Sequence, residues 1–156
     1  MSNRCIGLAL MAALLMALGA SAQPGAKPDK KLEVQLLWGT DLPASPNKDH
    51  KPVAPDIQKR LRSLPLRWTN YFMVKKMTLD VPRGDQGTNI AMSEKCSIGI
   101  KDLGESTLEF SFVSKNKQLE KQLEKRTQTL PPGDVFIYSG NAPGTNAWLV
   151  VLKRLK

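Results

Sequence analysis

The sequence contains one histidine and two cysteines in 156 residues, which removes side chains that many active sites require. His50 lies in a proline-rich stretch, and Cys96 follows 46 residues later in an alternating apolar segment. A cysteine nucleophile needs a neighbouring base, and a zinc site needs three or four His, Cys or carboxylate ligands. We therefore predict no catalytic cysteine, no zinc site and no cofactor. Cys96 is expected to face the core beside Ile98, and a free reactive thiol is the alternative.

Other catalytic signatures are missing as well. The sequence has no Gly-x-Ser-x-Gly motif, and no glycine-rich phosphate loop precedes a helix. The segment with Asp41, Asn47 and Asp49 lacks the alternating ligands and closing glutamate of a calcium loop, so no metal site is predicted. Paired carboxylates leave no linear signature, so a carboxylate-based enzyme of the cell envelope remains a third alternative.

Long hydrophobic runs are also scarce. The apolar run over residues 6–18 is shorter than the roughly 20 residues that span a bilayer as a helix. It follows a basic start at Arg4 and precedes Ala20, Ser21 and Ala22, the small residues that signal peptidase requires. We predict a cleaved signal peptide over residues 1–22 and no transmembrane segment in the mature chain, with an uncleaved anchor as the alternative.

The remaining cysteine content indicates the compartment. Cys5 leaves with the signal peptide, so the mature chain has one thiol and forms no internal disulfide. Small secreted animal domains usually depend on disulfides, and the chain also lacks an Asn-x-Ser/Thr glycosylation site. We therefore expect a bacterial protein that is exported to the periplasm or the extracellular space.

Positive charge is what the chain has in excess. Its formal net charge of +9 falls to +8 when the signal peptide, whose one charged residue is Arg4, is removed. The next segment, residues 23–31, contains two Pro, one Gly and three Lys and is typical of a flexible tether. Residues 32–156 are long enough for one domain with its own core.

Alternation of apolar and polar residues dominates that domain. It predicts strands over most of the sequence, and the apolar residues from Trp148 to Leu152 indicate a strand in the centre of a sheet. Turn residues separate these segments every 8–12 positions. The pattern predicts an all-β fold, an antiparallel β-sandwich or a partly closed barrel of about eight strands.

One short helix is expected early in the domain, near residues 55–64. Pro55 and Asp56 suit its first turn, Ile57, Leu61 and Leu64 share one face, and Pro65 ends it. Residues 117–126 are ambiguous, because Gln, Leu, Glu and Lys favour a helix while the surrounding segments favour a strand. We predict a strand there.

Basic residues gather between positions 48 and 76, where eight basic and two acidic residues contribute +6. Six of them are the candidate binding residues, and we call them the basic cluster: Lys59, Arg60, Arg62, Arg67, Lys75 and Lys76. A helix face of this kind attracts acidic proteins or polymers, and solubility alone is the alternative. The three tryptophans are expected to be core anchors, with ligand platforms as the alternative.

A set of short motifs in a fixed order resembles a known group of proteins. The motifs are Leu37-Trp38-Gly39, Arg67-Trp68, Asn70-Tyr71-Phe72, Met92-Ser93, Cys96, Leu130-Pro131 and Ala147-Trp148-Leu149-Val150-Val151. Their order is similar to that in small secreted proteins of environmental bacteria that have no assigned function. The resemblance covers nearly the whole mature chain and implies no activity or site residue.

These observations predict a non-catalytic exported β-sandwich that acts as an accessory or binding component of the bacterial envelope or of a secreted assembly. Its expected partner is an envelope protein. The alternative is a polyanion-binding protein that uses the basic helix face to hold nucleic acid, acidic glycan or lipid head groups, with affinity that falls steeply with salt. The sequence does not indicate an oligomeric state.

Overall fold

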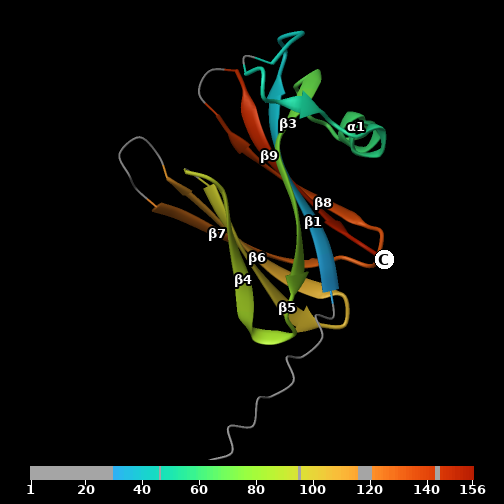
Figure 1. Cartoon of the computed structure of the whole chain (residues 1–156), viewed down its shortest axis with the longest axis vertical. Helices are drawn as coiled ribbons and strands as arrows, with labels where there is room; N and C mark the ends of the chain where they lie inside the picture. Colours follow the sequence, from blue (N-terminus) through green and yellow to red (C-terminus); the bar gives the residue numbers. More distant parts are fainter. Residues whose placement is uncertain (1–29, 46, 95, 116–120, 143–144) are drawn as a thin grey trace, which may run out of the picture.

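The computed structural model describes residues 30–45, 47–94, 96–115, 121–142 and 145–156. Within these residues, nine strands form two antiparallel sheets that face each other, and a single helix lies outside them (Figure 1). The predicted β-sandwich is therefore confirmed, while the alternative of a partly closed barrel is not, because both sheets keep open edges. The predicted signal peptide and the tether up to residue 29 lie outside the described residues.

Sheet A contains five of these strands in the order β2-β3-β1-β9-β8. Their bounds are Lys30–Thr40 for β1, Lys51–Pro52 for β2, Asn70–Val81 for β3, Val135–Asn141 for β8 and Ala147–Arg154 for β9. β9 lies between β1 and β8 and is buried along most of its length, as its continuous apolar run predicts.

Sheet B contains the other four strands in sequence order. They are β4 (Gly84–Ser93), β5 (Cys96–Gly104), β6 (Thr107–Lys115) and β7 (Lys121–Thr129). The strand predicted for residues 117–126 is confirmed from Lys121 onward, while 117–120 lie outside the described residues. A strand forms there despite the helix-favouring composition because nine residues of β7 pair with β6.

Alternation along the strands creates the main core between the sheets. β1 turns Leu32, Val34 and Leu36 toward sheet B, where they meet the inward residues of β5 and β6, including Phe110 and Phe112. Burial of these side chains is the main favourable contribution to the stability of the sandwich.

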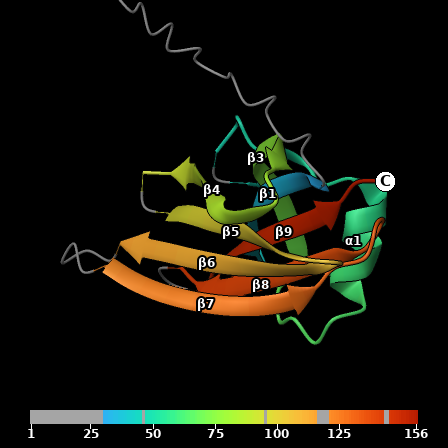
Figure 2. The same cartoon turned by 90° about the horizontal axis from the view of Figure 1, so that it is seen from below.

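A second core covers the outer face of sheet A. The helix, α1 (Pro55–Arg62), places Ile57 and Leu61 against Leu37 and Leu149, so α1 and sheet B lie on opposite sides of sheet A (Figure 2). The helix ends two residues before the predicted position 64. The next residue, Ser63, already donates its backbone N–H to the carbonyl of Arg60, three residues back, so the last turn tightens.

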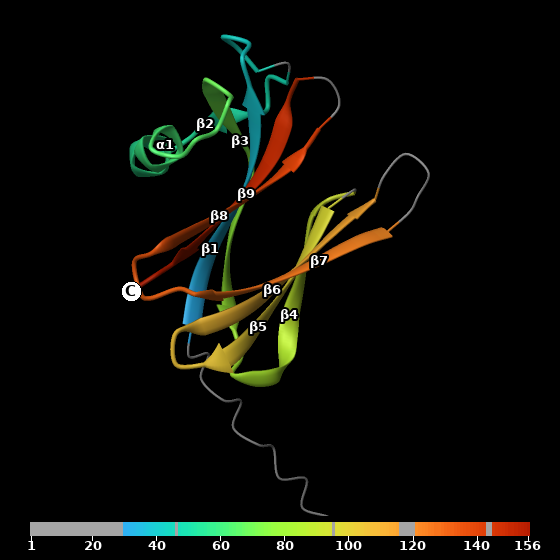
Figure 3. The same cartoon turned by 180° about the vertical axis from the view of Figure 1, so that it is seen from behind.

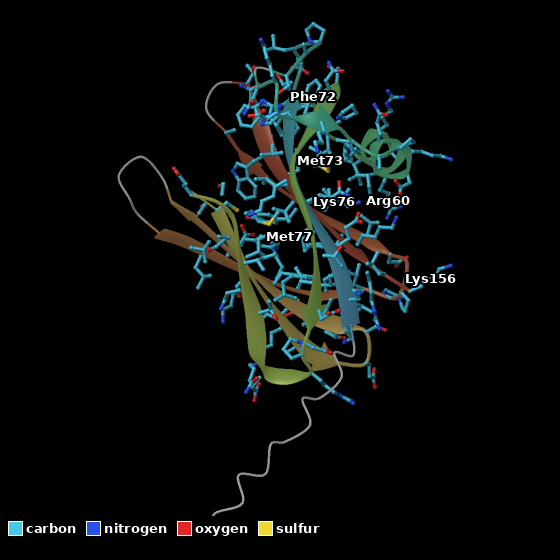
Figure 4. The ribbon with its side chains drawn as sticks, viewed as in Figure 1. Arg60, Phe72, Met73, Lys76, Met77 and Lys156 are labelled. Carbon is cyan, nitrogen blue, oxygen red and sulfur yellow. The ribbon has the colours of Figure 1, made fainter. Side chains whose placement is uncertain are left out.

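An irregularity beside Val74 interrupts the alternation of side chains along β3. The pairing with β1 shifts between Leu36 and Leu37, so β3 has one residue more than its partner at this point. As a result, Met73 packs on the helix side of sheet A while Met77 packs between the sheets (Figure 4). Simple alternation would have placed both methionines on one face.

Polar contacts tie the two sheets together at the end of the molecule where β1 begins. The ammonium group of Lys30 forms a buried ion pair with Asp102 of β5, and the two residues are 4 % and 3 % exposed. Arg154 of β9 donates to the carbonyl of Leu130 over 3.0 Å and to the hydroxyl of Ser106 over 3.2 Å. The predicted tether included Lys30 and Lys31, but both belong to β1. They pair with Val81 and Asp80 of β3, and the carbonyl of Lys31 accepts a hydrogen bond of 2.9 Å from the backbone N–H of Leu155.

Candidate binding pocket and basic surface

At the opposite end the sheets diverge (Figure 3), and a pocket of about 450 Å³ opens between β6 and β7 on one side and β8 and β9 on the other. We call it the aromatic pocket, and its lining residues are Phe112, Ser114, Leu123, Glu124, Tyr138, Gly140 and Trp148. Four strands from two sheets contribute to it.

Local strand geometry explains how the largest side chain reaches the pocket. Gly140 of β8 lies directly opposite Trp148 of β9 in the antiparallel pair. A Cβ atom at position 140 would overlap the six-membered ring of the indole. Glycine at this position therefore leaves the space that the Trp148 ring occupies.

The aromatic rings connect the two sheets. The ring of Tyr138 stacks on that of Phe112 with 3.9 Å between centroids and 9° between planes. It also contacts the Trp148 ring at 5.6 Å and 47°. Tyr138 thus joins an aromatic residue of sheet B to one of sheet A, and the three rings form a continuous wall of the pocket.

A charged group completes the wall. The Tyr138 hydroxyl donates to the carboxylate of Glu124, whose other oxygen pairs with Arg126. Burial, followed by the neighbouring carboxylate, raises the pKa of Tyr138 to about 12. The hydrogen bond from Tyr138 and then the one from Arg126 lower the pKa of Glu124. At neutral pH the pocket therefore holds a protonated phenol and an ionised carboxylate.

The helix part of the basic cluster is exposed. Lys59, Arg60 and Arg62 project from α1 away from its buried residues, Ile57 and Leu61, and form no ion pair with the residues that the structure describes. Their charges are therefore exposed to solvent, and binding of an anionic partner at this face stays a prediction.

The other three members of the basic cluster do not extend this surface uniformly. Lys76 pairs with Glu33 at 2.7 Å on the helix side of sheet A. Lys75 donates to the carbonyl of Ala91 in β4 over 2.7 Å, which places it on the other face of β3. Neighbouring residues of a strand point to opposite faces, so these two lysines do not form one surface.

Arg67 and Trp68 lie together on the helix side of sheet A, whereas Trp148 and Trp38 lie side by side on neighbouring strands. The Arg67 guanidinium lies 5.1 Å from the Trp68 ring centroid, and Trp68 packs against the helix-side core, as expected for an anchor. Trp148 packs at the edge of the inter-sheet core and also lines the aromatic pocket. Trp38 is its cross-strand neighbour on β1.

Cys96 is half-buried against the inter-sheet core, as predicted, and burial raises the pKa of its thiol. His50 accepts or donates a hydrogen bond of 2.7 Å with Ser45 in its loop. Among the described residues, no group of three or more His, Cys, Asp or Glu side chains is placed to hold a metal ion.

Sequence reasoning missed Phe112, Tyr138 and Glu124 as site residues. They come from three strands whose order in space depends on long-range pairing, so no linear spacing connects them. The one local signal is a glycine that faces a tryptophan across a hairpin, which indicates a large ring lying over the backbone.

Comparison with models of protein families, with curated proteins and with solved structures finds no match for this chain. In the described part of the chain, no helix has the length and apolar character needed to cross a membrane.

Proposed function

We propose that this protein is an exported, non-catalytic β-sandwich that serves as a binding component of the bacterial envelope or of a secreted assembly, and that it holds its partner in the aromatic pocket. The observation that carries the proposal is the pocket itself, an opening of about 450 Å³ with three aromatic rings and one ionised carboxylate. Aromatic walls with a few placed polar groups are typical of ligand sites.

The position of the pocket supports this function. The chain enters the sandwich at Lys30, and Trp38 beside the pocket follows eight residues later on β1. At about 3.3 Å per strand residue, the two positions are about 26 Å apart. A domain held through its N-terminal side would therefore present the pocket outward.

The charge state of Glu124 favours binding over acid catalysis. A glycosidase-type acid needs a raised pKa and a second carboxylate across the substrate. The pKa of Glu124 is lowered instead, and its oxygens accept hydrogen bonds from Tyr138 and Arg126. We therefore assign it the role of a hydrogen-bond acceptor.

Polyanion binding through α1 is the second candidate function. It is favoured by one observation, the exposure of Lys59, Arg60 and Arg62 without an acidic partner in the described residues. Such binding would weaken steeply with salt, because each cation that contacts a phosphate-like group releases counterions.

A pull-down with two variants separates the candidates. Residues 23–156 are immobilised and exposed to envelope extract and culture medium at low and high salt, as wild type, as Trp148→Ala, and as Lys59→Gln/Arg60→Gln/Arg62→Gln. The proposal predicts a component that is captured at high salt, lost with the pocket variant and retained by the helix variant. Capture at low salt alone that disappears with the helix variant would replace the proposal by polyanion binding.

A further inference from the structure

The size of the aromatic pocket limits what it can hold. Its volume of about 450 Å³ falls within the roughly 300–1,000 Å³ typical of small-ligand sites. The pocket therefore fits a small molecule or one unit of a polymer, and it is too small for a folded domain.

The aromatic wall favours a flat ligand. Phe112 and Tyr138 stack face to face, so their ring faces cover each other and do not converge on a central point as they would around a cation. Trp148 is tilted by 47° against Tyr138 and adds a second plane to the wall. The C–H groups of a saturated ring carry small positive charges and pack favourably against such aromatic surfaces.

The polar groups of the pocket are rich in acceptors. Tyr138 uses its proton on Glu124, so the phenol oxygen can accept a further hydrogen bond. The carboxylate of Glu124 accepts as well, and the Ser114 hydroxyl lies in the same lining. A ligand that carries several hydroxyl donors complements this arrangement.

The charges at the pocket compensate each other. Arg126 pairs with the carboxylate of Glu124, so the lining offers an ion no uncompensated charge. The class of ligand that best complements this lining is therefore a neutral one.

We propose that the aromatic pocket binds a neutral sugar ring of a glycan, which has hydroxyl donors, C–H faces and no charge. This inference rests on the proposed function, because it names the ligand class of the same pocket. The sugar ring packs against the Trp148 side of the wall, and its hydroxyl groups donate to Glu124 and Tyr138.

Calorimetric titration of residues 23–156 tests this ligand class. The probes are cellotetraose, maltotetraose and N-acetylchitotetraose, with tetramethylammonium chloride as a cationic probe. At least one oligosaccharide is expected to bind. Glu124→Gln should weaken that binding about tenfold, because it replaces a charged acceptor in the pocket by a neutral one.

A matched control is available on the other face of sheet B. Glu109 lies in β6 and contacts Lys125 at 3.9 Å on the outer face, so Glu109→Gln should leave sugar binding unchanged. Trp148→Ala should abolish binding, and if this variant does not fold, the Glu124→Gln and Glu109→Gln pair still decides the question.

Three results would overturn the inference. If none of the three sugars binds, or if a sugar binds equally well to the Glu124→Gln and Trp148→Ala variants, the pocket is not a glycan site. If tetramethylammonium binds and Glu124→Gln removes that binding, the ligand class is cationic. In each case the pull-down decides the proposed function separately. If capture of a component depends on Trp148, the proposed function stands without the sugar. If capture does not depend on Trp148, the proposed function fails as well.

Discussion

At the scale of single residues, the buried ion pair between Lys30 and Asp102 links the two sheets at the closed end. Lys30 also lies 3.3 Å from the carbonyl of Gly104 and 3.5 Å from that of Thr107, and Asp102 accepts from the Gly104 backbone N–H over 2.8 Å. We expect Lys30→Met to lower the free energy of unfolding by about 3–5 kcal/mol, because it leaves a buried carboxylate without its partner. Urea denaturation measures the change.

The double variant Lys30→Met/Asp102→Leu is the control for this prediction. Replacing both charges removes the unpaired group, so the double variant should be more stable than Lys30→Met alone. If the double variant is no more stable than Lys30→Met alone, the two residues do not act as a pair.

The same carboxylate makes stability depend on pH. Burial alone would raise the pKa of Asp102, but the hydrogen bonds from Lys30 and the Gly104 backbone outweigh it and leave the pKa below its usual 3.8. A group whose folded pKa is lowered stabilises the protein above its unfolded pKa and loses this effect as the pH falls through the folded value. The free energy of unfolding should therefore decrease below about pH 4.

Urea titrations at pH 7, 5, 4 and 3 check this dependence. Glu33 behaves in the same way, because the hydrogen bonds from Lys76 and Gln35 overcome the effect of its burial on the pKa. The Lys30→Met/Asp102→Leu variant should show a shallower decrease than wild type. An identical decrease in both proteins would mean that Asp102 does not contribute to it.

At the scale of elements, we expect α1 to depend on its apolar face and not on its exposed basic residues. Leu61 is 1 % exposed, and Leu61→Ala should cost about 2–5 kcal/mol of unfolding free energy through the cavity it leaves. The adjacent Arg62 is exposed, so Arg62→Gln should change stability by no more than about 0.5 kcal/mol. Thermal unfolding of the two variants compares them directly, and a large effect of Arg62→Gln would show that the basic face has a structural role.

The β8–β9 hairpin depends on Gly140 in a different way. Gly140→Ala inserts a methyl group into the space of the Trp148 ring and should destabilise the protein by about 1–3 kcal/mol. The neighbouring Ser139 is exposed, and Ser139→Ala serves as the control. Tryptophan fluorescence should shift in the first variant and not in the second, and equal behaviour of the two would contradict the described position of Trp148.

Many of the helices and strands were predictable from sequence, because the short-range periodicity of apolar residues determines where they form. The helix near residues 55–64 follows from the spacing of Ile57 and Leu61, and the central position of β9 follows from its continuous apolar run. The irregularity beside Val74 was not predictable. It depends on how β3 aligns with β1, and a period-two pattern contains no information on that alignment.

At the scale of the whole molecule, the arrangement of the sheets decides where function can lie. One end is closed by Lys30, Asp102 and Arg154, and the other is open at Trp148. Sequence alone identified Trp148 as a strand residue, but its role in a pocket follows only from the meeting of β6, β7, β8 and β9. The basic helix face was predictable because its residues are close in sequence. Lys75 and Lys76 were separable too, because neighbouring residues of a strand point to opposite faces, but which of them lies on the helix side depends on the irregularity in β3.

The central claim is that the aromatic pocket, and not the basic helix face, binds the partner. The three tryptophans report on different places. Trp148 lines the pocket, and Trp38 is its cross-strand neighbour. Trp68 lies under Arg67 on the helix side, and its indole N–H donates to the carbonyl of Thr145. The most direct measurement follows the three indole N–H signals by ¹H–¹⁵N NMR while residues 23–156 are titrated with the captured partner or with the oligosaccharide that binds. The account predicts that the Trp148 signal moves most and the Trp68 signal stays in place. A shift of Trp68 with an unchanged Trp148 would contradict it and assign binding to the basic surface.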